Sequence, residues 1–376
     1  MKIRIPRSAF LELVAAVAPA CGKVGVHVGV HLEADDLGRL VATASDNAYS
    51  IQAWAECEVD DPGAIVLPGA QLAKILGVLP DEGTINLSGS GDGGGGRLAC
   101  GRAEFDLAGY PAAEFPPEPL APIGEAGRID LPAKALAAGL RCTVPFVSDE
   151  ESRPALRNVA IRVHGRDLEV AATDGRRLGW YRTGLEGDVQ AGLWLVPDAM
   201  AKSIAAALTR CDDDPWIAVQ GRKLCAVVGR TAIRAALCDE AFPDYSRVIP
   251  SPNREAVVTF DRAKLREALR RVGTMADRSK ASEGHVLVKL AIGGREGIAL
   301  EAESGTLGKA KDELGLFAPR SSGRVVVGVN AIYLINALDV FTCERVQMQT
   351  DDQFSPMLLT ADDEPGPGHV VMPMRL

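Results

Sequence analysis

The side chains that could perform chemistry are scattered along the chain. Histidine and cysteine are frequent metal ligands and nucleophiles, and they occur here as His27, His31, His164, His285, His369, Cys21, Cys57, Cys100, Cys142, Cys211, Cys225, Cys238 and Cys343. No C-x-x-C pair exists, and His27 and His31 lie in V-H-V-G-V-H-L-E, which alternates like a strand. Strand residues four apart are separated by about 13 Å, too far to share one metal. We expect free buried thiols, surface histidines, no metal site and no cofactor.

No segment has the pattern of an enzyme active site. The glycine-rich run from Ser88 to Arg97 lacks the trailing G-K-[S/T] of a phosphate loop and no helix follows it, so we interpret it as an overlong hairpin tip. Asp174-Gly175 is typical of a turn, and no histidine lies in a motif that could orient it beside a nucleophile. The sequence predicts a non-catalytic protein.

Composition and charge are those of a soluble globular protein. The 376 residues are 47% hydrophobic and 24% charged, with a formal net charge of −9. No apolar run reaches the roughly 18–20 residues that a membrane helix needs. The start, M-K-I-R-I-P, alternates like a strand and lacks the apolar region of a signal peptide. We expect a cytoplasmic protein of two or three domains.

The elements that must position these side chains form a repeat. A short β-type run, a polar or proline breaker and an amphipathic helical segment recur six times, with strands expected at 3–6, 64–68, 128–132, 193–197, 256–261 and 324–329. Measured from Ile3, Ile65, Ile129, Leu195, Val257 and Val325, the steps are 62, 64, 66, 62 and 68 residues. A near-fixed period of this length indicates a repeated architecture.

Each repeat continues with alternating runs and turn signals. In D-L-E-V-A-A-T-D-G-R-R-L-G-W-Y, the pair Asp174-Gly175 predicts a two-residue hairpin. The unit is therefore β-α-β-β-β, and two units of about 64 residues make a domain of ordinary size. We predict an α+β fold of three similar domains, 1–127, 128–253 and 254–376, with joints in I-G-E-A-G and I-P-S-P-N-R.

The basic residues gather on the helical segments. Residues 1–127 carry 8 Lys+Arg and 17 Asp+Glu, whereas the other two thirds are nearly balanced. The helices or their ends contribute Arg7, Lys23, Lys74, Lys134, Arg141, Lys202, Arg210, Arg262, Lys264, Arg266, Arg270, Arg271, Arg278 and Lys280. If the repeats place the helices on one surface, an acidic protein would present a locally positive track to phosphates.

Three segments resemble one family. A-A-T-D-G-R-R-L (171–178), F-P-D-Y-S-R-V-I-P (242–250) and the terminal V-V-M-P-M-R-L (370–376) are similar to segments of the bacterial DNA polymerase III β subunit, the sliding clamp. The resemblance covers the whole chain. It implies a head-to-tail homodimeric ring with helices around the hole and antiparallel sheets outside. Such a ring encircles duplex DNA and tethers the polymerase, through phosphate contacts without base contacts.

The resemblance also implies a pocket for partner peptides between the second and third domains. It would comprise Leu156, Thr173, Gly175, Arg176, Arg177, Leu178, Pro243, Arg247, Val248, Val370, Met372, Pro373, Met374 and Arg375, with Asn330, Tyr333, Ser355 and Met357 at its border. Expected partners are the polymerase III α subunit, the clamp loader and other proteins with a clamp-binding motif, in a cytoplasmic, nucleoid-associated setting without membrane contact. The DNA-facing residues would be Lys23, Lys74, Lys134, Arg141, Lys202, Arg210, Arg266, Arg270 and Arg271.

For the subunit joint, the family uses an edge strand and a small apolar cluster. Here Phe105 and Leu107 would face Met275 of the other subunit. The chain departs from the family pattern at Cys21-Gly22-Lys23, where no proline-containing run follows, in the glycine-rich hairpin, and at Arg176, where the motif usually has histidine. These departures indicate a divergent or second clamp copy. The alternative that stays open is a non-catalytic β-rich binding protein unrelated to DNA.

Overall fold

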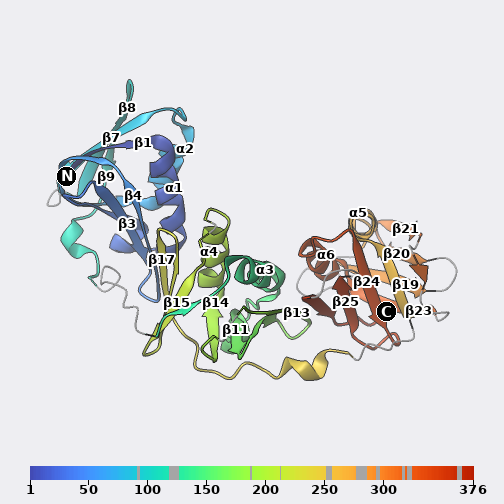
Figure 1. Ribbon diagram of the computed structural model, residues 1–376. Coiled ribbons are helices and arrows are strands. Elements are labelled where there is room, and N and C mark those ends of the chain that lie inside the picture. Colours follow the sequence, from blue (N-terminus) through green and yellow to red (C-terminus); the bar gives the residue numbers. More distant parts are fainter. Residues whose placement is uncertain are drawn as a thin grey trace. The chain divides into compact units, whose positions relative to one another are not determined.

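The computed structural model describes residues 1–90, 94–117, 127–186, 189–211, 213–250, 256–276, 286–293, 297–315, 318–319, 324–361 and 366–376 (Figure 1). These residues fall into two compact units. The first, unit 1, is Met1–Lys134 with Ala199–Leu237, and the second, unit 2, is Ala135–Asp198 with Cys238–Leu376. The expected domain joints lie largely outside the described residues, as do His285, Arg278 and Lys280.

All six predicted strand–helix pairs are confirmed. They are β1 (Lys2–Pro6) with α1 (Arg7–Val17), β6 (Gly63–Pro68) with α2 (Gly69–Val78), β10 (Ile129–Asp130) with α3 (Ala133–Thr143), β14 (Gly192–Pro197) with α4 (Asp198–Leu208), β18 (Ala256–Asp261) with α5 (Arg262–Gly273), and β23 (Arg324–Asn330) with α6 (Ala331–Asp339). The chain is therefore α+β, with one helix per repeat.

The start of each helix follows from the residue before it. Pro6, Pro68 and Pro197 end strands and are followed at once by a helix, where a missing N–H costs nothing because the first turn has no intrahelical acceptor for it. The last two helices are capped by side chains instead. Asp261 accepts a hydrogen bond from the Lys264 N–H at 3.0 Å, and Asn330 accepts one from the Ile332 N–H at 3.1 Å.

Unit 1 packs its helices against two antiparallel sheets. Its further strands are β2 (Gly29–Ala34), β3 (Arg39–Ser45), β4 (Tyr49–Glu56), β5 (Glu58–Asp61), β7 (Thr84–Ser90), β8 (Gly95–Cys100), β9 (Ala103–Ala108), β15 (Trp216–Gln220), β16 (Lys223–Val228) and β17 (Thr231–Ala236). The strand orders are β5-β1-β7-β8-β9 and β10-β15-β16-β17-β4-β3-β2-β6. The helices α1 and α2 lie side by side, and the fully buried Phe10, Leu72 and Leu76 fill the layer beneath them (Figure 1).

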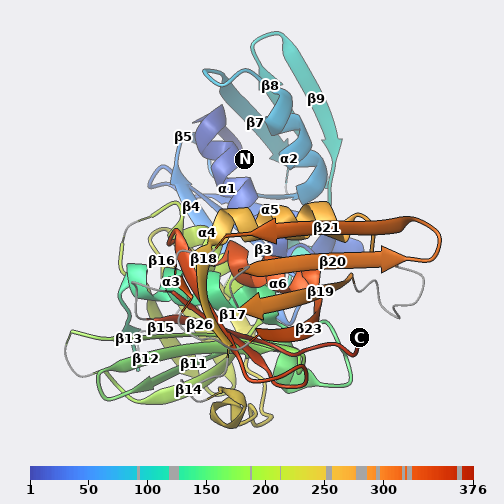
Figure 2. The same cartoon turned by 90° about the vertical axis from the view of Figure 1, so that its right-hand side faces the viewer.

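Unit 2 repeats this construction. Its further strands are β11 (Asn158–His164), β12 (Asp167–Thr173), β13 (Arg177–Gly184), β19 (Leu287–Gly293), β20 (Ile298–Ser304), β21 (Gly308–Leu314), β22 (Ala318–Pro319), β24 (Arg345–Thr350), β25 (Met357–Ala361) and β26 (Pro367–Val371). They form the sheets β14-β11-β12-β13-β26-β25-β24-β18-β22 and β21-β20-β19-β23. Figure 2 shows the second of these sheets as four adjacent strands, with β21 nearest α5.

Pairing of β13 with β26 brings distant segments together. The register sets Arg177 opposite Val371 and Leu178 opposite Val370. On the other side of β26, Val371 faces Met357 and Val370 faces Leu358. A hairpin from the middle of the sequence and the end of the chain thus belong to one continuous sheet.

Three details of the sequence interpretation are wrong. The run from Val26 to Glu33 is not one strand, because Gly25–Val28 forms a 3-10 turn and β2 begins only at Gly29. Two histidines are buried: His31 is 4% exposed and His369 is 0% exposed. The glycine-rich run is a hairpin but not an overlong one, because β7 and β8 pair up to Ser90 and Gly95. Residues 91–93 lie outside the described residues.

All eight cysteines are free thiols, as expected, but only Cys100, Cys142 and Cys225 are buried. The other five are partly exposed. Among the described residues, no helix is long and apolar enough to cross a membrane.

Candidate functional site

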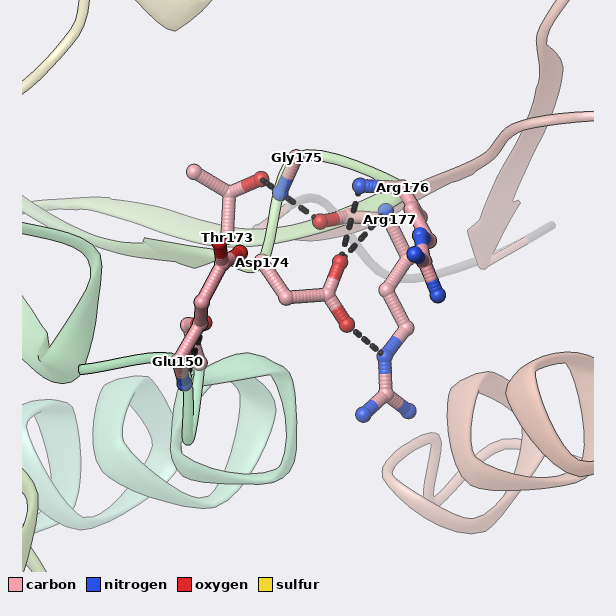
Figure 3. A network of polar contacts seen from close by, with 7 residues as sticks. Glu150, Thr173, Asp174, Gly175, Arg176 and Arg177 are labelled. Carbon is pink, nitrogen blue, oxygen red and sulfur yellow. Dashed lines mark hydrogen bonds and ion pairs between the residues drawn. The ribbon is translucent and has the colours of Figure 1, made fainter. Parts of the chain in front are cut away.

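The tip of the β12–β13 hairpin is held by its own polar groups. The Thr173 hydroxyl donates to the Arg177 carbonyl at 2.7 Å and accepts from the Gly175 N–H at 3.0 Å. Asp174 Oδ1 accepts from the N–H groups of Arg176 at 2.8 Å and Arg177 at 3.0 Å (Figure 3). Gly175 has φ 85°, a conformation that favours glycine. The predicted hairpin is confirmed, but its turn lies one residue further on: the Asp174 N–H donates to the Arg177 carbonyl at 3.4 Å, so the central residues are Gly175 and Arg176 and not the predicted pair Asp174-Gly175.

Arg177 is fixed on three sides. Its Nε lies 2.8 Å from Asp174 Oδ2, and its guanidinium lies 4.4 Å from the Tyr333 ring centroid and 5.4 Å from that of Phe146. These distances permit cation–π attraction to both rings. Its Nη1 is buried and has no hydrogen-bond partner among the described residues. Arg177 is therefore a rigid cation whose Nη1 group leaves two N–H donors unused among the described residues.

The last residues of the chain cross from this hairpin to a second strand. The Met372 N–H donates to the Arg176 carbonyl at 2.9 Å, and the Met374 N–H donates to the Gly328 carbonyl at 2.8 Å. A Cβ on Gly328 would lie 2.5 Å from the Met374 carbonyl oxygen, so only glycine permits this close approach. Met372 and Arg375 remain exposed, whereas Pro373 and Met374 are partly buried.

The segment that links the middle repeats to the fifth is anchored beside the hairpin. Ala171, Leu178, Trp180, Tyr245, Leu358 and Val370 form one buried cluster, against which Phe242 and Ile249 pack. Tyr245 begins the 3-10 turn Tyr245–Val248, in which Arg247 and Val248 are exposed. Pro243 is exposed as well. The sequence motif F-P-D-Y-S-R-V thus alternates anchors that are buried with side chains that face solvent.

The structure brings seven of the predicted pocket residues together: five form the hairpin and its tip, Val370 belongs to the cluster, and Met372 bonds the Arg176 carbonyl. Thr173 and Leu178 are buried, while Gly175 and Arg176 are exposed at the tip. Leu156 is buried in the 3-10 turn Pro154–Arg157, and a Cβ on Gly175 would lie 3.1 Å from Nη1 of the neighbouring Arg153. Of the border residues, Tyr333 contacts Arg177 and Met357 pairs with Val371, whereas Asn330 caps α6 and the Ser355 carbonyl accepts from Thr350.

Sequence reasoning missed several residues that support this region. Phe146 lies under Arg177, and its ring also stacks on His369 at 4.8 Å. Glu169 accepts a hydrogen bond from the Tyr245 hydroxyl. Phe146, His369 and Glu169 could not be assigned this role from the sequence, because the role depends on the residues that pack against them in the fold. Tyr245 itself lies inside a recognised motif and could have been singled out as the one large aromatic residue between polar neighbours.

The basic residues of the helices differ in their exposure and in whether they form ion pairs. Lys23, Lys74, Lys134, Arg141, Lys202, Arg210, Arg270 and Arg271 are exposed, and Arg266 is partly buried. Arg266 forms an ion pair with Asp339, and Arg271 lies 2.8 Å from Asp312. Arg141 donates to the Val340 carbonyl. Arg270 makes no ion pair with any described residue, so its charge is the most available on α5.

Each sheet has an edge strand at either end, and two of these edge strands bear on the expected subunit joint. The first is β9 in unit 1, where Phe105 and Leu107 are partly buried and alternate with the exposed Glu104 and Asp106. The second is β21 in unit 2. Met275 lies next to β21, because a Cβ on Gly308 would be 3.5 Å from the Met275 Cε.

The described residues contain no group of three His, Cys, Asp or Glu side chains that could hold a metal. The features that gather in unit 2 are instead a rigid cation, exposed methionine and valine side chains, and glycines that allow close backbone approach. Such features are typical of a site that receives a peptide.

Comparisons with known proteins give one answer. The family model described as "DNA polymerase III beta subunit, N-terminal domain" matches residues 1–119, and the one described as "DNA polymerase III beta subunit, C-terminal domain" matches residues 246–375. A beta sliding clamp of Caulobacter vibrioides is 28% identical over the full length of both chains. One of Synechocystis is 29% identical over 92% of this chain and 91% of its own.

Solved structures that resemble this chain are sliding clamps as well. The DNA polymerase III β subunit of Thermotoga maritima matches 100% of this chain and 99% of its own, with a TM-score of 0.86 and 25% identity. A sliding clamp of Pseudomonas aeruginosa matches all of both chains with a TM-score of 0.84 and 25% identity. The fold is the DNA clamp fold, a class of non-catalytic binding proteins. The chain belongs to the bacterial DNA polymerase III β subunit family, the β sliding clamps. The expectation of a clamp is confirmed, and a β-rich protein unrelated to DNA is not favoured.

Proposed function

We propose that the chain is a processivity factor that encircles duplex DNA and holds partner proteins through the site at the β12–β13 hairpin. The observation that carries the proposal is the convergence of three separate segments: the hairpin tip, the linker turn Tyr245–Val248 and the C-terminal residues from Met372 onward. Partners would be the polymerase III α subunit, the clamp loader and other proteins with a clamp-binding motif.

The chemistry of the site suits a short apolar peptide. Met372 and Val248 are exposed apolar side chains, and methionine adapts to ligands of different shape. Arg176 and Arg247 at the rim can orient peptide carbonyls or carboxylates. Leu156, Thr173, Gly175, Arg177, Leu178, Pro243, Val370, Pro373, Met374 and Arg375 would complete the pocket.

The DNA-facing role is assigned to the helices, with Lys23, Lys74, Lys134, Arg141, Lys202, Arg210, Arg266, Arg270 and Arg271. Lysine and arginine side chains that are not already in an ion pair displace counterions from the DNA when they approach phosphates. This interaction needs no contact with the bases. Because Arg266 and Arg271 are already paired with carboxylates, Arg270 would contribute most within α5.

The ring would close by pairing of the free edges. Phe105 and Leu107 on β9 of one subunit would face Met275 and β21 of the other, and Glu104 and Asp106 on β9 would meet Lys309 and Lys311 on β21. The domains would span 1–127, 128–253 and 254–376. Each proposed domain has strand pairs of its own, such as β1 with β7, β10 with β15, and β18 with β24, while β4 with β17 and β13 with β26 pair from one proposed domain to the next. The protein would be cytoplasmic and nucleoid-associated.

Peptide binding tests the proposal. Deletion of Met372–Leu376 removes two methionines from the site and two backbone hydrogen bonds, but none of the strands. The shortened protein should fold, and its affinity for a fluorescent peptide of the Gln-x-x-Leu-Phe type should fall at least tenfold, or about 1.4 kcal/mol. Val248→Ala should lower the affinity about threefold. Val78→Ala is the matched control, since Val78 is 80% exposed in unit 1. Unchanged affinity after the deletion would assign partner binding to another surface.

A further inference from the structure

The linker turn that forms one wall of the proposed peptide site is attached to the sheet through the Tyr245 side chain. The Tyr245 hydroxyl donates a hydrogen bond to Glu169 Oε1. Tyr245 is buried and belongs to the apolar cluster, whereas the next three residues of the turn, Ser246, Arg247 and Val248, are exposed. The position of those three residues therefore depends on the two anchors that flank them, Tyr245 before them and Ile249 after them.

Glu169 is itself held in place by two arginines on neighbouring strands. The register sets Glu169 of β12 opposite Arg162 of β11 on one side and opposite Arg182 of β13 on the other. Arg182 Nε lies 2.6 Å from Glu169 Oε2, and Arg162 Nη1 lies 3.8 Å from Glu169 Oε1. The Glu169 side chain is only 17% exposed. A carboxylate with two cationic neighbours is a strong and well-oriented acceptor.

This group lies on the face of the sheet that is turned away from α3. A Cβ on Gly139 of α3 would meet Val170 and Tyr181, so these residues face the helix. Since side chains alternate along a strand, Glu169 and Ala171 face the opposite way. The Trp180 indole lies over Gly368 on that same face, where a Cβ would collide with it. Tyr245 packs in the cluster with Trp180, and its hydroxyl reaches the next row of the sheet.

The hydroxyl is a dependable donor. Burial, together with the hydrogen bond to Glu169 and the charge of that carboxylate, raises the pKa of Tyr245. The phenol therefore stays protonated at neutral pH. Phe242 adds an edge-to-face contact with the Tyr245 ring at 6.1 Å, which fixes the ring but not the direction of its hydroxyl.

We propose that Tyr245 and Glu169 are positioning residues for partner binding: their hydrogen bond holds the turn Tyr245–Val248 in the shape that receives the peptide. The inference rests on the proposed function of the site. Without the bond, the apolar cluster still anchors the ring, but the exposed end of the turn samples more conformations. A peptide must then order the turn on binding, which lowers its affinity although every group that touches the peptide is still present.

The test uses Tyr245→Phe, which removes only the hydroxyl. The matched control is Tyr49→Phe in unit 1, because the Tyr49 hydroxyl is also buried and donates to Ser203. Tyr245→Phe should weaken binding of the labelled Gln-x-x-Leu-Phe peptide about fivefold. Tyr49→Phe should leave the affinity unchanged, although each variant removes a hydroxyl that donates a hydrogen bond within the fold.

A second measurement separates positioning from general stability. The Arg247 side chain is 83% exposed, so trypsin cleavage after Arg247 in the native protein reports how often the turn opens. Tyr245→Phe should speed this cleavage severalfold, and Tyr49→Phe should not. Glu169→Gln, which keeps an oxygen acceptor for the hydroxyl, should fall between wild type and Glu169→Ala in both assays.

The outcomes are distinct. If Tyr245→Phe binds the peptide as tightly as wild type does, or if Tyr49→Phe weakens binding equally, the positioning role is overturned and the peptide site stays intact. Absence of peptide binding by the wild-type protein overturns the proposed site and, with it, this inference.

Discussion

His369 is the side chain whose charge the fold tolerates least. It is fully buried between Phe146, stacked at 4.8 Å, and Phe341, edge-on at 4.9 Å. Burial, with a smaller effect from Arg141, lowers the pKa of His369 to about 3. Neither ring nitrogen has a hydrogen-bond partner among the described residues. The imidazole is therefore kept neutral in an apolar stack.

This burial predicts a loss of stability in acid. In the unfolded chain, His369 binds a proton as pH falls below about 6.5, whereas in the folded chain it stays neutral until about pH 3. The unfolded state thus binds more protons throughout that window, and the free energy of unfolding should fall by about 1.4 kcal/mol per pH unit below 6.5. His369→Phe should remove this part of the dependence and be at least as stable at pH 7.

Urea unfolding at pH 7 and pH 5 measures the effect. The difference between the two pH values should be smaller in His369→Phe than in the wild type by roughly 2 kcal/mol. His31→Phe replaces a second buried histidine, in unit 1, for comparison. Burial also lowers the pKa of His31, but the charge of nearby Glu33 opposes that shift. An identical pH dependence in His369→Phe and wild type would contradict the assignment.

Residue types alone predicted part of this neighbourhood. Gly175 follows from the turn that needs a positive φ, and Leu178 and Val370 follow from recognisable motifs. His369 was expected at the surface because histidine is usually polar and accessible, and only the pairing of β13 with β26 shows that it is enclosed. Glu169 and Phe146 were missed because their roles come from partners far away in sequence.

At the scale of elements, α5 is the helix whose charge can be tested most directly. Arg270 is exposed without an ion pair among the described residues, whereas Arg266 and Arg271 are neutralised by Asp339 and Asp312. Arg270→Ala should therefore weaken direct DNA binding and reduce the slope of log K against log salt by roughly 0.9 for each phosphate that is no longer neutralised. Arg266→Ala should change the slope less.

Fluorescence anisotropy with duplex DNA over a salt series provides this measurement. Arg157→Ala is the matched control, because Arg157 is an exposed arginine in a 3-10 turn of unit 2 and belongs to none of the helices that carry proposed DNA-facing residues. A slope that is the same in Arg270→Ala and in wild type would mean that α5 does not face the duplex.

The repeat made the elements more predictable than the residues. A short segment alone can fit either a strand or a helix, but six copies of the same pattern support one assignment. Every strand–helix pair was therefore placed correctly. The failure at Gly25–Val28 has a local cause: alternation of valine with histidine imitates a strand, but Gly25 adopts φ 58° and the Gly22 N–H bonds the His27 carbonyl, which closes a turn. Backbone hydrogen bonds of this kind override a β-type pattern.

At the scale of the whole molecule, the proposed assembly depends on two edge strands, β9 and β21. The sequence suggested Phe105, Leu107 and Met275 only through the family resemblance, since an edge strand is defined by the pairing of all its neighbours. Exposed edges invite pairing with another chain. In the proposed ring, these two edge strands pair with each other across the subunit joint, so neither edge stays open to other chains.

Removal of the apolar side chains at this joint should therefore open the ring. Phe105→Ala with Met275→Ala should cost roughly 2–4 kcal/mol of association free energy, which weakens dimerisation about 30- to 1,000-fold. Phe105 is partly exposed in one subunit, so its replacement should leave the fold intact. Light scattering at micromolar concentration should give a mass near 39.7 kDa for the double variant and twice that for wild type. Phe354→Ala, which alters a phenylalanine that is 68% exposed elsewhere, should remain a dimer.

The same variants test whether the ring is a topological link to DNA. Wild-type protein placed on nicked circular plasmid by a clamp loader should stay bound through moderate salt and leave once the plasmid is linearised, because screening weakens phosphate contacts but does not open a closed ring. The Phe105→Ala/Met275→Ala protein should dissociate from both forms of DNA, whereas Phe354→Ala should behave as wild type. Equal retention of wild type on circular and linear plasmid would mean ordinary electrostatic binding and would refute encirclement.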